Sequence, residues 1–251
     1  MATVLRLTLS QLGGRWRLAL ILLLAALPIG LAALVSATLS EAESSNEEFV
    51  NTLLDTLLIA GILPIVMMVL ATASFGNEVE DKTLSYLVLR PLRRSLIALP
   101  KLLAPIIVGG PVLVVSGVVA TLLGGSSLGV VIVVLHGDGQ AALAVGTAVL
   151  AGVVAYAAVF TWAGLMTTRA LAFGLMYVFI WEGLITTFLG GVRYLSIRAY
   201  TLAILHGMDK TSFGSLEDRV IEFPAAVGGA IIVTVVFFLL TVRRLRRMDV
   251  P

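Results

Sequence analysis

Long runs without any charged residue constrain this chain more than any other feature. Such runs cover 18–40, 56–75, 102–135, 139–168 and 223–242. A helix needs about 20 apolar residues to cross the hydrocarbon core of a bilayer. Only 13% of the 251 residues are charged, which is about half the share found in a typical soluble domain. Too few polar side chains are present to cover these runs in water, so the sequence predicts an all-α integral membrane protein.

We expect six transmembrane helices. The run at 102–135 is too long for one simple crossing, and it becomes rich in glycine and serine from residue 124, so we end the helix before that point. A further span, at 170–190, is interrupted by a single acid, Glu182. The expected spans are at about 18–40, 56–75, 102–123, 141–166, 170–190 and 223–242.

Residues 1–17 precede the first span and are themselves amphipathic. Apolar side chains such as Leu5 and Leu9 alternate at helical spacing with Arg6 and Arg15. This pattern predicts a helix that lies in the membrane interface and leads into a retained span. A cleaved signal peptide is the alternative, because basic residues also precede the apolar run of a signal peptide.

The distribution of basic residues predicts the orientation. With both termini in the cytoplasm, thirteen of the seventeen Lys and Arg residues lie in cytoplasmic segments, and four lie outside. The first outer loop contains four glutamates and no base between residues 41 and 48. Loops rich in Lys and Arg remain on the cytoplasmic side, so we expect a multi-pass protein of the plasma or inner membrane with both termini in the cytoplasm.

A charged segment at 76–94 separates the second and third expected spans. Asn77 and Glu80 have the spacing of a capping box, and Glu78 and Asp81 would lie in a first turn, where the helix dipole favours acids. Leucines follow at helical spacing, and Pro91 ends the pattern. The segment predicts a cytoplasmic amphipathic helix, which would either rest on anionic headgroups or dock on a partner protein.

The same segment resembles the permease subunits of ATP-binding-cassette exporters of the second export class, the ABC-2 family. The shared pattern is G-x-E-x-E-x-x-T-L-x-x-L-x-x-R-P, beginning at Gly76 and followed by Arg93, Arg94 and Lys101. Lys82 departs from the pattern, because relatives usually have glycine before the threonine. The resemblance implies that 76–94 is a coupling helix that docks on an ATPase subunit. The implied docking residues are Asn77, Glu78, Glu80, Asp81, Thr83, Leu84, Leu87 and Arg90.

The resemblance also implies the assembly. Two permease subunits, identical or different, would enclose a pathway and bind two copies of a separate ABC ATPase, with 191–222 forming an outer re-entrant gate. ATP and Mg²⁺ would bind the partner, because this chain has no G-x-x-x-x-G-K-[ST] phosphate loop. We expect neither a catalytic site nor a metal site in a chain with no cysteine and two widely separated histidines. No basic run is interleaved with aromatic residues, so a nucleic-acid partner is not expected.

Glu182 is the intramembrane polar candidate. A carboxylate at this depth should face protein or water rather than lipid. It could contact a substrate or the opposing subunit, or it could be hydrogen-bonded to a neighbouring helix and fix the packing. An ion- or proton-coupled secondary carrier that uses Glu182 is therefore one alternative function, and a non-transporting membrane adaptor is another.

Small residues recur every fourth position in the fourth expected span, at Ala144, Ala148 and Gly152. Such spacing lets helices approach closely in lipid. We interpret it as tight packing within one subunit, with a dimer interface as the alternative.

Overall fold

The computed structural model describes residues 2–38, 51–81, 93–124, 139–167, 169–186, 190–214, 216 and 221–247, and every regular element within them is a helix. Five described helices have the length and apolar character to cross a membrane: Arg15–Val35, Asn51–Glu80, Ser95–Leu123, Gly139–Met166 and Phe223–Arg246. The predicted span at 170–190 appears as a shorter apolar helix, Ala170–Ile185. The described part is thus all-helical, as expected for an all-α membrane protein, with five helices long enough to cross a membrane.

The N-terminal segment forms two helices, as expected, but the first ends earlier than residue 17. Helix α1 covers Ala2–Leu12, and α2 begins at Arg15 and continues to Thr38 after a break at Gly13 and Gly14. Leu12 is fully buried, and Leu5 and Leu9 pack against the core. The amphipathic pattern predicted for this segment therefore corresponds to a face that packs on the rest of the bundle.

The helix Asn51–Glu80, which we call span two, is continuous and has three parts. Residues Asn51–Leu53 are α-helical, Leu54–Ile62 form a π-helical stretch, η1, and Leu63–Glu80 form α4. The shorter helix at the predicted fifth span also contains a π-helical stretch, because α9 (Ala170–Met176) is followed by η2 (Tyr177–Ile185). Each π-helical stretch contains one acidic residue, Asp55 or Glu182. π-Helical turns are frequently found at functional sites.

Helix α8 (Gly139–Met166) lies at the centre of the bundle, where it contacts α4, α6 (Ser95–Gly124), α11 (Ile197–Met208) and α12 (Phe223–Arg246). Ala144, Ala148 and Gly152 are all buried there. A Cβ on Gly152 would lie 2.8 Å from the hydroxyl of Thr201 in α11, so this position needs glycine. The small residues serve packing within one chain, as the first of the two interpretations predicted.

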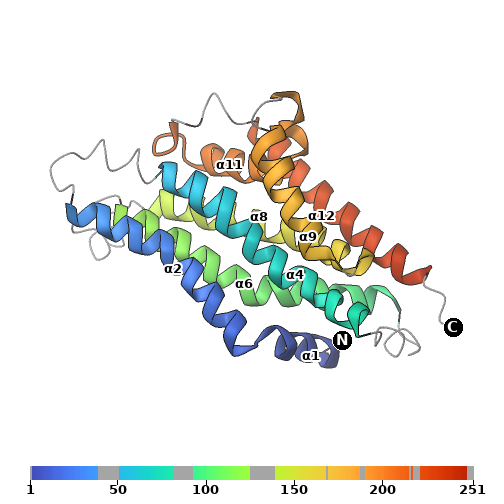
Figure 1. Ribbon diagram of the computed structural model, residues 1–251. Coiled ribbons are helices and arrows are strands. Elements are labelled where there is room, and N and C mark those ends of the chain that lie inside the picture. The colour runs from blue at the N-terminus through green and yellow to red at the C-terminus, as the bar shows by residue number, and fades with distance from the viewer. Residues whose placement is uncertain are drawn as a thin grey trace.

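The two ends of the bundle differ in what they contain. The N- and C-termini lie at one end, together with the last turns of α4, whereas α11 lies at the other end (Figure 1). An apolar cluster joins four helices near the termini and contains Phe75, Ile97, Ala98, Leu165, Val242 and Leu245. We call the end with the termini the inner end and the end with α11 the outer end.

Candidate functional site

The predicted start of the coupling helix lies inside span two. Because α4 continues to Glu80, Asn77, Glu78 and Glu80 belong to its last turns, and the interpretation of Asn77 as an N-cap is wrong. Phe75 is fully buried in the inner apolar cluster, and this packing carries the helix past the expected boundary at residue 75. The acids therefore lie at a helix C-terminus, where the dipole opposes negative charge.

A buried lysine compensates for this placement. Lys101 of α6 forms an ion pair with Glu78, with 2.5 Å between Nζ and Oε1, and its side chain is 1% exposed. Lys101 Nζ also donates to the carbonyl of Ser74, and the Ser74 hydroxyl donates to the carbonyl of Lys101, both at 2.6 Å. These bonds join α4 to α6, the helices on either side of the charged segment. Glu78 is therefore bound within this chain by Lys101.

The other predicted docking residues divide into two groups. Glu80 and Asp81 are exposed at the inner end, and Asn77 is partly exposed. Asn77 and Asp81 line a surface cavity of about 450 Å³ together with Trp16, Arg17 and other residues of the α1–α2 junction. Thr83, Leu84, Leu87 and Arg90 lie outside the described residues.

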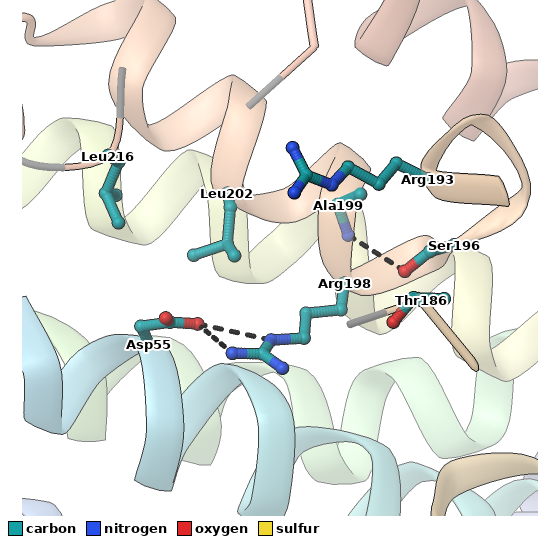
Figure 2. A pocket seen from close by; sticks show the side chains of 8 residues that line it. All are labelled: Asp55, Thr186, Arg193, Ser196, Arg198, Ala199, Leu202 and Leu216. Carbon is teal, nitrogen blue, oxygen red and sulfur yellow. Dashed lines mark hydrogen bonds and ion pairs between the residues drawn. The ribbon is translucent and has the colours of Figure 1, made fainter. Parts of the chain in front are cut away.

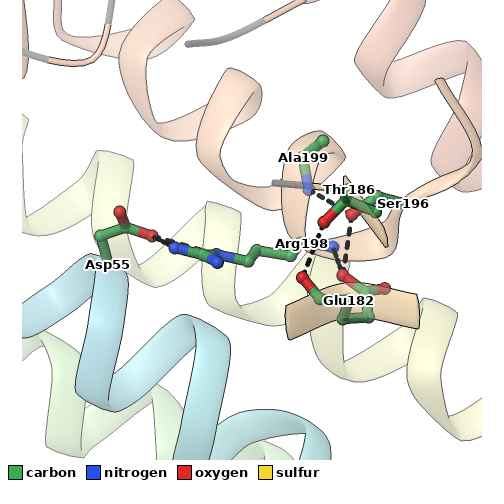
Figure 3. Close-up of polar contacts among 6 residues, drawn as sticks. All are labelled: Asp55, Glu182, Thr186, Ser196, Arg198 and Ala199. Atoms are coloured by element: carbon green, nitrogen blue, oxygen red, sulfur yellow. Dashed lines mark hydrogen bonds and ion pairs between the residues drawn. The ribbon is translucent and has the colours of Figure 1, made fainter. Parts of the chain in front are cut away.

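At the outer end, Glu182 lies against the start of α11 (Figure 3). Its carboxylate accepts hydrogen bonds from the backbone N–H groups of Ile197, at 3.0 Å, and Arg198, at 3.2 Å. The hydroxyl groups of Ser196, at 2.7 Å, and Tyr177, at 3.0 Å, also donate to it. The carboxylate thus has four hydrogen-bond partners, two of them backbone N–H groups at the start of α11.

Ser196 contributes the remaining N-terminal capping bond of α11. It is the N-cap residue of α11, and its hydroxyl oxygen accepts the N–H of Ala199 at 3.1 Å. Glu182 and Ser196 together therefore satisfy the first three N–H groups of α11, which have no partner within a helix. Glu182 is 2% exposed. It faces a neighbouring helix, as the packing interpretation expected.

In the first turn of α11, the side chain of Arg198 contacts span two. Its Nη2 and Nε donate to Oδ1 of Asp55 at 2.7 and 3.2 Å. The pair lines a cavity of about 360 Å³ that Thr186, Arg193 and Leu202 also border (Figure 2). The expected second span begins at residue 56, so the sequence did not single out Asp55 as a site residue. The signal that could have identified it is its position directly before an apolar run, in a chain with few acids.

The family model described as ABC-2 family transporter protein matches residues 15–183, which is more than half of the chain. The chain belongs to the ABC-2 transporter family. The match begins at the first residue of α2 and ends directly after Glu182, so it covers the first four long helices and nearly all of α9 and η2. No curated protein matches the sequence.

Membership in the ABC-2 family identifies the chain as a multi-pass membrane transport subunit. It agrees with the family resemblance that the charged segment and the order of spans indicated. The described inner end contains the beginning of the segment that carried the resemblance, with Glu80 and Asp81 exposed on it.

Proposed function

We propose that this chain is the permease subunit of an ATP-binding-cassette exporter and that it couples to a separate ATPase. Two copies, or one copy and a similar subunit, enclose the pathway, and each binds one ATPase that carries ATP and Mg²⁺. The observation that carries the proposal is the family match over residues 15–183. The missing phosphate loop supports the assignment of nucleotide hydrolysis to a partner.

The proposed topology has six spans, with the short helix Ala170–Ile185 as the fifth, and places the inner end in the cytoplasm. Support comes from the basic residues: the inner end contains Arg15 and Arg17 as well as Arg243, Arg244 and Arg246 in the last turn of α12. Lys and Arg concentrate on the cytoplasmic side of bacterial and eukaryotic membranes alike. The membrane is the plasma or inner membrane.

The proposed docking surface is the segment 76–94 with its neighbourhood. Glu80 and Asp81 are its accessible acids, whereas Glu78 positions the segment through Lys101. The cavity between the α1–α2 junction and the end of α4 borders the same surface, and Trp16, which is 90% exposed, projects beside it. Large aromatic side chains are enriched where proteins bind one another.

Co-purification tests this function. The tagged full-length chain should retain an ATPase from its own membranes, and the double variant Glu80→Lys with Asp81→Lys should lower that retention by about tenfold, equivalent to about 1.4 kcal/mol. The matched control is Glu222→Lys, which reverses an exposed acid at the outer end. Recovery of no ATPase with the unaltered chain, or full retention by the double variant, would contradict the proposal.

The same preparation separates the alternatives. An exporter subunit should accelerate ATP hydrolysis by its partner when transported substrate is present in the membrane. An adaptor would retain the ATPase without changing its turnover under any substrate tested. A carrier would transport in vesicles containing this chain alone, with a rate that is lost in Glu182→Gln.

A further inference from the structure

The outer segment after η3 (Gly190–Leu195) forms a compact unit at residues 197–213, which we call the cap. Asp209 ends α11, and its Oδ1 accepts bonds from the N–H and hydroxyl of Thr211 and from the N–H of Ser212. His206 Nδ1 lies 2.9 Å from the carbonyl of Phe213 and closes the turn back onto α11. The cap is therefore bonded internally from its helix to its last residue.

Span two holds this cap at two points. Asn51 Nδ2 donates to the carbonyl of Ser212 at 2.9 Å, beyond the end of α11. One turn further along span two, Asp55 binds the guanidinium of Arg198 in the first turn of α11. Residues four apart lie on the same face of a helix, so one face of span two contacts both ends of the cap.

Span two also reaches the inner end without interruption. The helix Asn51–Glu80 has 30 residues, which corresponds to about 45 Å at 1.5 Å per residue. Asn51 and Asp55 lie at its start, and Glu80 lies at its end, next to the segment that we propose to dock on the ATPase. A displacement of the inner end of such a helix must also move its outer end, unless the helix bends.

We propose that Asn51 and Asp55 are positioning residues through which span two carries the cap as one body. Movement imposed near Glu80 during the ATPase cycle then displaces α11 at the exit side. The source of the movement rests on the proposed function, whereas the attachment of the cap to span two is a property of this chain alone. Glu182 holds the same helix from span five, so the cap lies between two spans that can move against each other.

Spin-label distances test the attachment. The chain has no cysteine, so labels can be placed at Thr56→Cys on span two and Lys210→Cys in the cap, both at exposed positions. We expect one narrow distance distribution in the full-length chain, and we expect Asp55→Ala to broaden it. The exchange of charges, Asp55→Arg with Arg198→Asp, should narrow it again. Glu222→Gln is the control for the loss of an exposed outer acid and should change nothing.

A second label pair tests the transmission. Lys210→Cys is combined with Leu239→Cys, an exposed position on α12, in the complex with the ATPase before and after trapping with vanadate. In the unaltered complex we expect the Lys210–Leu239 distance to change on trapping. In the Asp55→Ala complex the distance should be the same before and after trapping, and in the charge-exchanged complex it should change again. The Thr56–Lys210 distance should be equal in both states of the unaltered complex.

Three outcomes would overturn the inference: a narrow Thr56–Lys210 distribution in Asp55→Ala, a Thr56–Lys210 distance that changes on trapping, or a Lys210–Leu239 shift that persists in Asp55→Ala. Failure of the chain to bind any ATPase would refute the proposed function instead. The Thr56–Lys210 measurement on the chain alone would still decide whether span two holds the cap.

Discussion

The two ends of span two carry ion pairs that differ in burial and in reach along the chain. At the inner end, Glu78 and Lys101 are 23 residues apart and join consecutive long helices, and Lys101 is 1% exposed. At the outer end, Asp55 and Arg198 are 143 residues apart, and Arg198 is 22% exposed. The inner pair joins helices that are consecutive in the chain, whereas the outer pair joins segments that are far apart in the sequence. Span two is therefore bound to α6 by a buried lysine near the proposed docking segment, and to the cap by a more exposed arginine.

Removal of the inner lysine should have the largest effect. Lys101→Met leaves the mostly buried Glu78 without its cation, which costs about 3–5 kcal/mol of unfolding free energy. Thermal unfolding of the purified chain measures this loss. The double variant Lys101→Met with Glu78→Met should recover most of it, because two apolar side chains of similar size can replace a buried ion pair. If Lys101→Met alone is as stable as the unaltered chain, the Lys101–Glu78 ion pair does not stabilise the inner end of span two.

Glu182→Gln should have the next largest effect. The amide places an NH₂ group against donors that now point at a carboxylate, and we expect a loss of about 2 kcal/mol. Glu222→Gln, at an exposed position, should stay within about 0.5 kcal/mol. If Glu182→Gln unfolds at the same temperature as the unaltered chain, the carboxylate does not hold α11, and a role in the pathway regains support.

The outer ion pair should contribute less than the inner one. Asp55→Asn keeps the acceptor oxygen but loses the charge, and the pair is partly reached by water, so we expect about 1.5 kcal/mol. The unfolding free energy that Asp55→Asn loses should also be smaller in high salt, because salt screens exposed charges more than buried ones. Equal losses for Asp55→Asn and Lys101→Met would erase the difference between the two ends.

Prediction from the sequence was accurate where a single helix decides the outcome. The charge-free runs located the five long apolar helices, and the small residues at Ala144, Ala148 and Gly152 indicated close packing that the structure places inside the chain. The expectation that Glu182 faces protein or water rather than lipid agrees with its hydrogen bonds to the start of α11.

The ends of the helices could not be predicted in the same way. The expected spans began or ended next to Asp55, Glu78 and Lys101, because a charge usually ends a membrane span, and Glu78 was expected in the first turn of a separate cytoplasmic helix. Each lies within a helix because a partner from another element compensates its charge. Such partners are separated by 23 and 143 residues, and nothing in the local pattern shows that they meet. The N-cap interpretation of Asn77 failed for this reason.

Asp209 offers the smallest effect and tests whether the cap is held by its own bonds. Burial opposes ionisation of Asp209, but the hydrogen bonds from Thr211 and Ser212 outweigh it and lower its pKa below the usual 3.8. A depressed pKa stabilises the folded state above the unfolded value, and this contribution is lost as the pH falls through the folded value. The unaltered chain should therefore unfold at a higher temperature than Asp209→Asn at pH 7, with the difference shrinking below about pH 4. A difference independent of pH would contradict this.

Span two is proposed to join a cytoplasmic docking end to an exterior cap. Whether its two ends lie on opposite sides of the membrane can be measured by labelling. Single cysteines at Asp81→Cys and Lys210→Cys, both exposed positions in a chain without cysteine, can be labelled with a membrane-impermeant maleimide. The account predicts that intact cells label only Lys210→Cys and that Asp81→Cys reacts after permeabilisation. Labelling of both positions from the outside, or of Asp81→Cys alone in intact cells, would contradict it.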